Sequence, residues 1–444
     1  MLDQSLSAEN FVKIFEDENR KGNDLASRFI PTVKEINNQI RNERNKLIKK
    51  KSGLSKPDKD VVRAKITELK KDKDTELNLY FEKLASEATL NTKENYKINL
   101  EKNTSIASKP VYLIKKDDAV SYFIIKQLQR NIRKLYKVKQ SDRHQIVSQL
   151  SILLNNKFPK HLIRTDIQEF YETIPHDKLL EIIDHENLLS FTSKQYIKSI
   201  LNEYRVLSAS DKGLPRGVGV SAYLAELYMR DFDRKINCDD EVIYYARYVD
   251  DIVVLYAPKP DSNMSVKRAQ IAKVAVENGL VINREKTKVF PQIKDKFKFD
   301  YLGYEFNFDS KNSKNIFLDM SQRKLEKYKN RIDRSFESYI NATSKREKLA
   351  RKTLISRIEF LTSNTKLYGN KNGTLIGIYF SNRLINIATH LIELDKHLIT
   401  KVSQLNSLLI QAKFENLSFK KGFDNKTFHK YSTQAIQKIV KVWD

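Results

Sequence analysis

The sequence predicts an α+β protein in which a central region of strands and helices lies between two helical regions. Near the N-terminus, the apolar residues Val33, Ile36, Ile40 and Leu47 recur at heptad-like spacing. Between residues 111 and 306, runs rich in β-branched and aromatic residues alternate with helical stretches. After Met320, apolar residues again recur every three or four positions. We therefore expect three regions, 1–110, 111–305 and 306–444.

The composition indicates a globular protein with a polyanionic partner. The chain has 444 residues, of which 81 are Lys or Arg and 56 are Asp or Glu, so the net charge is +25. Such an excess favours nucleic acid first and an acidic membrane surface second. A hydrophobic content of 40%, with 11 Gly and 9 Pro, excludes a disordered or collagen-like chain.

The single cysteine and the lack of long apolar runs restrict the compartment. Cys238 has no partner for an internal disulfide or a thiolate-rich zinc site, which suits a reducing environment. Residues 1–15 have no continuous apolar core, so we expect no signal peptide. Since no apolar run approaches the length of a membrane span, we expect a soluble, cytoplasmic protein without a membrane partner.

Two antiparallel helices are expected over residues 33–84. A second apolar stripe begins with Val62, Ile66 and Leu69, and Ser52 to Pro57 supply the break. The end of the first helix is strongly basic, with Arg41, Arg44, Lys46, Lys49, Lys50 and Lys51. These cations either form a solvated helix end that complements the helix dipole or contact a phosphate backbone, and both interpretations stay open.

Seven strand-like runs place the sheet in the central region. They are Val111–Ile114, Tyr122–Ile125, His161–Ile167, Val242–Tyr248, Ile252–Ala257, Thr287–Phe290 and Tyr301–Phe306. Two of them flank the acidic pair Asp250 and Asp251, a pattern that alone reads as a β-hairpin with an Asp turn. Adjacent carboxylates between apolar strands repel each other and lose hydration, so ionising both requires a compensating cation.

A third carboxylate changes the interpretation of this pair. Asp166 ends the run that begins at His161, and Pro175 suits the first turn of the helix that follows. Alone, Asp166 would be a turn or capping aspartate. Three carboxylates from two strands can hold two divalent ions, one activating the attacking oxygen and one stabilising the leaving pyrophosphate. The pattern therefore indicates nucleotidyl transfer.

These residues resemble the motifs of reverse transcriptases. Tyr248 to Asp251 resembles the tyrosine-x-aspartate-aspartate box, and Asp166 to Tyr171 resembles the first palm motif. Three further segments follow the family's order: Gly213 to Ser221 for the glycine-rich segment, Gly279 to Thr287 for the next motif, and Tyr301 to Tyr304 for the primer grip. Ordered motifs over about 140 residues are far more specific than any one of them.

The resemblance implies a right-hand polymerase. Its fingers and palm, an antiparallel sheet plus helices, would occupy 111–305, after a basic helical hairpin within 1–110 and before an all-α thumb and C-terminal domain over 306–444. It implies that Asp166, Asp250 and Asp251 are catalytic. The same aspartates and the Ile167 carbonyl would bind Mg²⁺, with Mn²⁺ as the alternative.

The resemblance also implies nucleotide-binding positions, which are Phe170, Tyr171, Arg216, Gly217, Val249, Lys286 and Lys116. Tyr171 matches the ring that closes the space beside the sugar 2′ carbon and would make DNA the product. One of the two rings, Phe170 or Tyr171, is expected only to pack. Lys286 matches a triphosphate contact, whereas Lys116 either grips phosphates or belongs to an ordinary turn.

Nucleic acid contacts are expected on the primer grip and the thumb. The implied residues are Arg143, Tyr301, Gly303, Arg323, Lys327 and Arg331. The last three lie in an expected helix from Ser321 to Tyr339, with apolar residues on one face and cations on the other. A merely solvated basic face is the alternative.

One residue differs from the usual reverse transcriptase motif and makes the resemblance more specific. Many reverse transcriptases have Gln where this sequence has Arg216. Together with Ser221 to Met229, Thr362 to Lys371 and Gly377 to Asn382, this arginine resembles the abortive-infection and defence-associated enzymes of bacteria. The resemblance implies antiphage defence, deoxynucleoside triphosphates as substrates, a noncoding RNA as template or scaffold, and a DNA product. Templated or untemplated synthesis, the primer, a protein partner and homo-oligomerisation stay open.

Two alternatives remain. A retron-type or group-II-intron-type enzyme would copy a template in the ordinary way, and Arg216 argues against it. A catalytically silent RNA-binding scaffold would keep the fold for its shape. The intact set of three aspartates argues against the scaffold, because buried carboxylates without a cation are costly.

Overall fold

The computed structural model describes residues 2–49, 56–104, 109–155, 158–291, 296–309, 315–342, 347–367, 373–405 and 407–443. The chain forms two compact units, and each combines segments that are distant in the sequence. Unit 1 comprises Met1–Gln140, Ile167–Cys238 and Gln270–Asn283; unit 2 comprises Ser141–Asp166, Asp239–Ala269 and Arg284–Asp444. The division into three functional regions stays a prediction.

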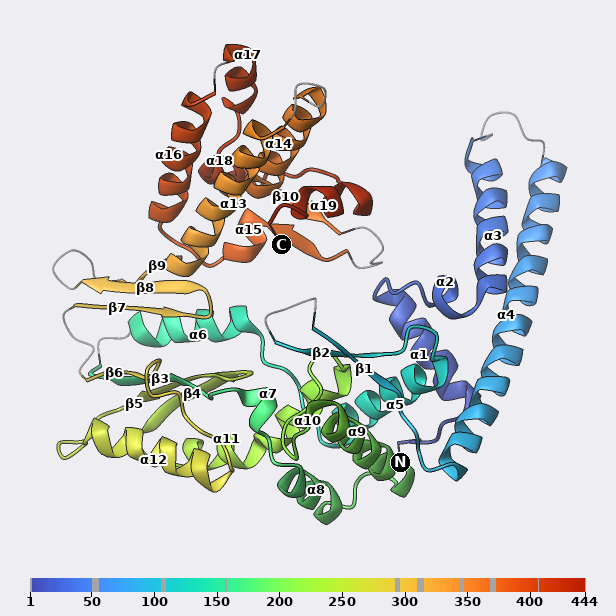
Figure 1. Cartoon of the computed structure of the whole chain (residues 1–444), viewed down its shortest axis with the longest axis horizontal. Helices are drawn as coiled ribbons and strands as arrows, with labels where there is room; N and C mark the ends of the chain where they lie inside the picture. The colour runs from blue at the N-terminus through green and yellow to red at the C-terminus, as the bar shows by residue number, and fades with distance from the viewer. Residues whose placement is uncertain are drawn as a thin grey trace. The chain divides into compact units, whose positions relative to one another are not determined.

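Unit 1 begins with four helices, α1 (Ala8–Arg20), α2 (Leu25–Phe29), α3 (Pro31–Lys49) and α4 (Lys56–Lys93). The predicted hairpin is confirmed, since α3 and α4 pack side by side as two long helices (Figure 1). The side chain of Ser7 caps α1 by accepting a hydrogen bond from the Asn10 amide. Lys50, Lys51 and the break at 52–55 lie outside the described residues.

Aromatic rings join this hairpin to the next helix of unit 1, α5 (Ala119–Leu135). The Phe81 ring of α4 lies with its centroid 5.3 Å from that of Phe123 and 5.5 Å from that of Phe15. All three rings are buried. Such edge-to-face clusters contribute more than their buried area alone.

The predicted strand over Tyr122–Ile125 is wrong, because these residues lie within α5. Asp118 caps this helix, with its Oδ1 accepting from the Ser121 amide at 2.8 Å. All four residues of the run are buried. A short, fully buried apolar run does not distinguish strand from helix, so the cap and the long periodic stretch decide.

The rest of unit 1 consists of a short hairpin and further helices. Strands β1 (Leu100–Asn103) and β2 (Val111–Ile114) pair antiparallel. The helices are α7 (Phe170–Thr173), α8 (His176–His185), α9 (Phe191–Ser208), α10 (Gly219–Tyr228) and α11 (Arg230–Asn237). Helix α12 (Met264–Glu277) begins in unit 2 and ends in unit 1.

Two antiparallel sheets of more than two strands lie in the described part of unit 2. The first has the order β4-β5-β3-β6, with β3 (His161–Asp166), β4 (Val242–Tyr248), β5 (Asp251–Tyr256) and β6 (Lys288–Phe290). The second has the order β7-β8-β9, with β7 (Lys296–Tyr301), β8 (Tyr304–Asp309) and β9 (Phe317–Met320). Helix α6 (Arg143–Asn155) lies between them, and its apolar residues share one core with both sheets (Figure 1).

The predicted strand Tyr301–Phe306 is interrupted by a turn, and its second half belongs to β8. Tyr301 ends β7, Leu302 and Gly303 turn with φ of 47° and 76°, and Tyr304 begins β8. The positive φ at Gly303 is why a glycine interrupts the apolar run. The six other predicted runs include the four strands of the first sheet and β2, with ends shifted by at most one residue.

Helices dominate the C-terminal part of unit 2. They are α13 (Gln322–Ile340), α14 (Glu347–Thr362), α15 (Ile378–Asn382), α16 (Thr389–Ser403), α17 (Leu408–Gln411), a 3-10 turn (Ala412–Phe414), α18 (Phe419–Asp424) and α19 (Thr433–Val440). The predicted helix from Ser321 is confirmed as α13. A short hairpin of β10 (Asn364–Lys366) and β11 (Leu375–Gly377) interrupts them. Residues 368–371 of the segment beginning at Thr362 lie outside the described residues.

The fold class is confirmed in that antiparallel sheets and helices combine as in a right-hand polymerase. The region predicted to be all-α is not entirely helical, because β9, β10 and β11 lie within it. Within the described part of the chain, no helix combines the length and the apolar character needed to cross a membrane.

Candidate active site

The first sheet of unit 2 brings two of the three predicted aspartates opposite each other. Asp166 is the last residue of β3 and Asp251 the first of β5, and the antiparallel register pairs these two positions directly. Asp250 lies in the tight turn that joins β4 to β5. Three carboxylates therefore gather at one end of the central strand pair, as the strand pattern predicted.

The turn before the acidic pair holds a strained residue. Val249 has φ of 60°, which places a β-branched side chain in the left-handed region. Such a conformation costs roughly 1–2 kcal/mol. The Val249 carbonyl accepts a hydrogen bond of 2.9 Å from Nη1 of the buried Arg247. Strain of this kind concentrates at functional sites, where the surrounding structure maintains it.

The charges around the aspartates are only partly balanced. Burial, Asp250 and Asp166 raise the pKa of Asp251, while Arg164, with Nη2 3.8 Å from Asp251 Oδ1, opposes the rise. Lys286 Nζ donates to Asp166 Oδ2 at 2.7 Å, and this bond raises the pKa of Lys286. The structure thus brings the predicted triphosphate contact, Lys286, to the predicted metal ligand.

Asp166 retains one oxygen suited to a cation. The residue is 6% exposed, and Oδ1 is buried with no hydrogen-bond partner among the described residues. A buried carboxylate oxygen without a donor is costly. Because Mg²⁺ prefers carboxylate and carbonyl oxygens, Asp166, Asp250 and Asp251 fit a divalent cation by their chemistry.

A second acidic cluster lies elsewhere in unit 2. Among the described residues, Asp239, Asp240 and Glu241 are the group of three whose carboxylate oxygens all approach within 4.8 Å, whereas the three predicted aspartates do not converge so closely. Lys267 Nζ lies 2.8 Å from Asp239 Oδ1 and 2.9 Å from Glu241 Oε1, and Lys259 pairs with Asp240. Lysines already balance this cluster.

In unit 1, Arg216 connects two neighbours of the predicted nucleotide site. Its Nη2 lies 2.7 Å from Glu172 Oε1, and its guanidinium carbon lies 5.3 Å from the Tyr171 ring centroid. Phe170 is buried and Tyr171 is half-buried, so Phe170 is the ring that packs in the core. Sequence reasoning missed Glu172, although a carboxylate next to Tyr171 was a possible partner for a nearby arginine.

Gly217, the next predicted residue, permits a close backbone approach. Its φ is 99°, and an added Cβ would lie 2.6 Å from Val111 Cγ1 and 2.7 Å from the Tyr112 carbonyl oxygen. The Tyr112 amide also donates to the Arg216 carbonyl at 2.6 Å. Gly217 therefore allows the loop that contains Arg216 to pack closely against β2.

We expect Gly217→Ala to destabilise the protein by roughly 1–3 kcal/mol, because both the positive φ and the Tyr112 carbonyl oppose a Cβ. Gly219→Ala is the matched control, since its Cβ would meet only the flexible end of Gln129. Chemical denaturation of the two variants checks this. Equal stability of both would show that the close approach has no energetic role.

Two further predicted site residues, Lys116 and Ile167, have contacts within unit 1. Lys116 is exposed in the turn before α5, and its carbonyl accepts from Arg28 Nε at 3.0 Å. Ile167 follows Asp166 in the chain and forms a bridge with Ile282 in unit 1. Their contacts with phosphate and metal stay predictions.

The primer-grip residues of unit 2 form a connected group. Tyr301 is buried and donates to the Asp251 carbonyl at 3.3 Å. Arg143 Nη2 donates to the Ser381 carbonyl at 3.0 Å, and its guanidinium lies 5.5 Å from the Tyr304 ring centroid. A Cβ on Gly303 would meet Lys324 Cε at 2.8 Å. Arg143 therefore already has protein partners, which the sequence could not show.

Lys324 makes the folding stability of the protein depend on pH. It donates to Ser381 O at 2.9 Å and to Asn382 Oδ1 at 2.8 Å, while burial and the nearby Arg143 lower its pKa to about 7. Between about pH 7 and roughly pH 10.4, Lys324 is protonated in the unfolded chain and neutral in the native protein. Because the unfolded chain then binds more protons, Lys324 makes the free energy of unfolding rise with pH in this range.

We expect Lys324→Met to remove that rise. Denaturant unfolding of both proteins from pH 6 to pH 10 measures the difference in their unfolding free energies at each pH. Parallel pH profiles for the two proteins would contradict the assignment.

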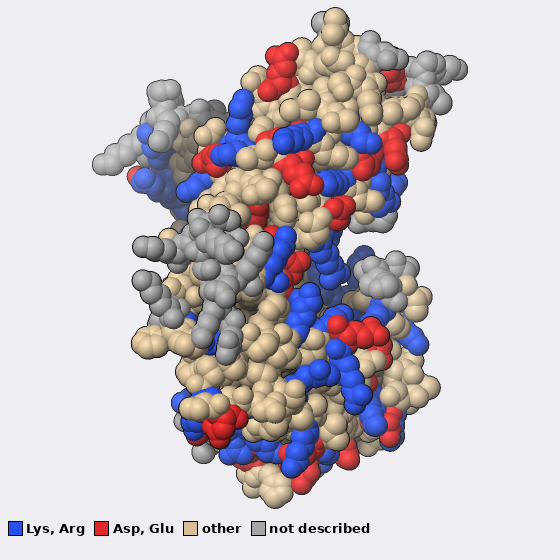
Figure 2. Space-filling model, turned by 90° about the vertical axis from the view of Figure 1, so that its left-hand side faces the viewer, with Lys and Arg blue, Asp and Glu red and all other residues tan. Residues whose placement is uncertain are grey.

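The thumb helix presents two exposed cations. Arg323 and Lys327 are exposed on α13 and take part in no ion pair among the described residues, whereas Arg331 lies 5.1 Å from the Trp443 ring centroid. Figure 2 shows blue and red side chains interspersed over the face it presents. The net charge of +25 therefore does not appear on that face as a uniformly basic surface.

Comparison with known proteins identifies one domain. Residues 114–306 match the family described as reverse transcriptase (RNA-dependent DNA polymerase). This segment contains the three aspartates, Lys286, Arg216 and the primer-grip turn. No curated protein matches the chain in sequence.

Similar solved structures are distant. Apo telomerase from Candida tropicalis, truncated from its C-terminal domain, is 14% identical with a TM-score of 0.33, over 51% of this chain and 55% of that chain. Telomerase from Candida albicans with a fragment of telomeric RNA is 12% identical with a TM-score of 0.31, over 72% and 53%. The BmCPV RNA-dependent RNA polymerase at elongation state is 9% identical with a TM-score of 0.30, over 81% and 46%.

These likenesses are too weak to carry an argument about this chain, which spans between 53% and 65% of the telomerase chains that it matches. Residues 114–306, which are less than half of the chain, therefore contain a reverse transcriptase domain by their similarity to this family.

Proposed function

We propose that the protein adds deoxynucleotides to a DNA strand by two-metal nucleotidyl transfer at Asp166, Asp250 and Asp251. The observation that carries this proposal is the β3–β5 register, which sets Asp166 opposite Asp251 beside the strained turn of Asp250. Mg²⁺ is the expected ion, with Mn²⁺ as the alternative. When bound, the two ions would activate the attacking hydroxyl and stabilise the leaving pyrophosphate.

The residues of the chain then have distinct tasks. Asp166 Oδ1 is available to a cation, while Oδ2 is held by Lys286. Lys286 neutralises part of the charge of the crowded carboxylates, and its ammonium would also contact the incoming triphosphate. Arg164 and Arg247 fix the surroundings of Asp251 and the Val249 carbonyl.

Tyr171 is proposed to select the sugar. A half-buried ring that contacts a guanidinium and lies next to an ion pair has little freedom to move aside. A fixed ring of this size would collide with a ribose 2′ hydroxyl, so the product is DNA. Arg216 acts through Tyr171 and Glu172 and is a positioning residue in this account.

We further propose that the enzyme works in bacterial antiphage defence, in the cytoplasm, with a noncoding RNA as template or scaffold. Arg216 at the position of the usual Gln supports this narrower assignment. Its ion pair with Glu172 shows how the chain accommodates the extra charge.

Purification with bound nucleic acid tests the proposal. We would sequence the co-purified nucleic acid and the products made from each dNTP. A discrete RNA and DNA products that depend on dNTP and Mg²⁺ are expected. Products complementary to the RNA indicate templated synthesis, and products unrelated to it indicate untemplated synthesis. Stable RNA binding without any dNTP incorporation would instead favour the silent scaffold.

We expect RNA binding to weaken strongly with salt, because each phosphate contact releases counterions. Arg323→Gln with Lys327→Gln should reduce the slope of log affinity against log salt by about 1.4, at roughly 0.7 per single-strand contact. Lys438→Gln with Lys441→Gln, which removes two exposed cations from the C-terminal segment, is the control. If the two double variants have equal slopes of log affinity against log salt, Arg323 and Lys327 do not contact the RNA.

A further inference from the structure

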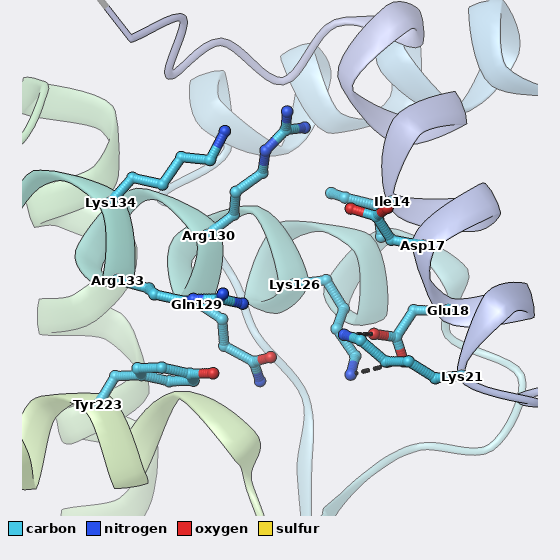
Figure 3. A pocket seen from close by; sticks show the side chains of 10 residues that line it. All are labelled: Ile14, Asp17, Glu18, Lys21, Lys126, Gln129, Arg130, Arg133, Lys134 and Tyr223. Carbon is cyan, nitrogen blue, oxygen red and sulfur yellow. Dashed lines mark hydrogen bonds and ion pairs between the residues drawn. The ribbon is translucent and has the colours of Figure 1, made fainter. Parts of the chain in front are cut away.

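Unit 1 contains a small polar cavity that the polymerase mechanism does not use. It measures about 290 Å³ and lies where α1 and α10 pack against α5 (Figure 3). Since one water occupies about 30 Å³ of liquid, a phosphate group fits together with several waters. The lining residues are Ile14, Asp17, Glu18, Lys21, Lys126, Gln129, Arg130, Arg133, Lys134 and Tyr223. We call this space the α5 cavity.

The acidic residues of the α5 cavity are already neutralised. Glu18 is buried, with its carboxylate 2.8 Å from Lys21 Nζ and 2.9 Å from Lys126 Nζ (Figure 3). Burial alone would raise the pKa of Glu18, but the hydrogen bonds and charges of the two lysines lower it to about 2. Asp17 pairs with Arg20 on the same helix. Neither carboxylate is left to balance further cations.

Three cations of α5 remain, namely Arg130, Arg133 and Lys134. Among the described residues, none of them forms a salt bridge or a side-chain hydrogen bond. Five cationic and two acidic side chains line the α5 cavity, so it has an excess of three positive charges. Figure 3 shows Arg130 and Lys134 extending from α5 toward the same side.

Arg130 distinguishes the α5 cavity from an ordinary solvated helix end. Arg133 and Lys134 lie in the last turn of α5, where cations complement the helix dipole, so the dipole accounts for them. It does not account for Arg130 Nη1, which is buried and has no partner among the described residues. A buried guanidinium nitrogen without an acceptor is costly, and an anionic oxygen in the cavity would relieve that cost.

We propose that the α5 cavity is a phosphate-binding site. The planar forks of Arg130 and Arg133 match phosphate oxygens, and Lys134 adds a point charge. Gln129 and Tyr223 supply an amide and a hydroxyl at its edge. The ligand chemistry is a phosphate group, carried either by a nucleic acid strand or by a free phosphate compound. None of the three aspartates lines the α5 cavity, so we infer binding and not catalysis at this site.

Calorimetric titration tests this inference on the full chain without dNTP or divalent metal, so its result is independent of the polymerase proposal. The probes are inorganic phosphate, an RNA oligonucleotide with a 5′-phosphate, and the same oligonucleotide with a 5′-hydroxyl. Arg133→Gln with Lys134→Gln should weaken phosphate binding at least about tenfold. Lys70→Gln with Lys71→Gln, which removes the same charge from exposed positions of α4, should leave it unchanged.

Arg130→Gln supplies an independent readout. It should also weaken phosphate binding at least about tenfold, while the melting temperature stays the same or rises, because a buried guanidinium nitrogen without a partner is removed. A structural role would lower the melting temperature instead. If this variant does not fold, the double variant at Arg133 and Lys134 carries the test.

The probes separate the sources of the phosphate. Weakened binding of both oligonucleotides identifies a backbone phosphate, and weakened binding of only the 5′-phosphorylated one identifies a terminal phosphate. An effect on inorganic phosphate alone identifies a free compound. The inference is overturned if inorganic phosphate and RNA bind the double variant at Arg133 and Lys134 as tightly as they bind its α4 control.

Discussion

Replacing Asp250 and Asp251 with Asn is expected to lower the rate of dNTP incorporation by at least roughly a thousandfold. The two substitutions remove two of the three carboxylates that would hold the cations. Lewis-acid stabilisation of the transferring phosphate supplies several kcal/mol, and each 1.36 kcal/mol is tenfold in rate. Primer extension with Mg²⁺ on an RNA template measures the change.

The acidic cluster at Asp239, Asp240 and Glu241 supplies a matched control. Asp239→Asn with Asp240→Asn removes the same charge from carboxylates that are already paired with Lys259 and Lys267. This variant should keep the incorporation rate within a few-fold, apart from any loss of stability. Similar rates for the two double variants would exclude the β3–β5 site as the catalytic centre.

Tyr171→Ala is expected to relax sugar selection by about 10- to 200-fold in the ratio of deoxy- to ribonucleotide incorporation, the range for steric discrimination by a single group. The ring lies beside the Arg216 guanidinium and is half-buried, so its removal opens space without emptying the core. Competition between dNTP and rNTP in single-nucleotide incorporation measures this ratio.

Phe170→Leu is the control for this prediction. Phe170 is buried, so its substitution should lower stability and leave the ratio nearly unchanged. Arg216→Gln should shift the ratio less than Tyr171→Ala does, because the ring remains and loses only its guanidinium neighbour and the partner of Glu172. An unchanged ratio in Tyr171→Ala would place the sugar gate elsewhere.

The placement of the three aspartates on the sheet could be predicted from the sequence because its determinants are local. Two strand patterns flank Asp250 and Asp251, and a third ends at Asp166. Antiparallel pairing of these strands then places Asp166 and Asp251 at the same end of the sheet. Lys286 could be identified only through the family resemblance, since its bond to Asp166 joins residues 120 positions apart.

Contacts between distant segments account for what the sequence could not predict. The run Tyr122–Ile125 is buried along its whole length within α5, where Phe123 packs against rings of α1 and α4, so its four consecutive apolar residues show no period that distinguishes a helix from a strand. The partners of Arg143 lie at residues 304 and 381, and the ion pair of Arg216 joins the loop before α10 to helix α7. The α5 cavity likewise combines residues of three helices, none of which has a recognisable motif.

Manganese binding tests the central claim most directly, because the acidic centre must hold a divalent cation before it can transfer a nucleotide. We would titrate Mn²⁺ by electron paramagnetic resonance into the wild type, Asp250→Asn with Asp251→Asn, and Asp239→Asn with Asp240→Asn, each with a dNTP present. The account predicts that the first double variant loses protein-dependent Mn²⁺ binding beyond that of the dNTP alone and that the second retains it. Retention by the first and loss by the second would contradict the account and move the metal centre to the cluster at Asp239.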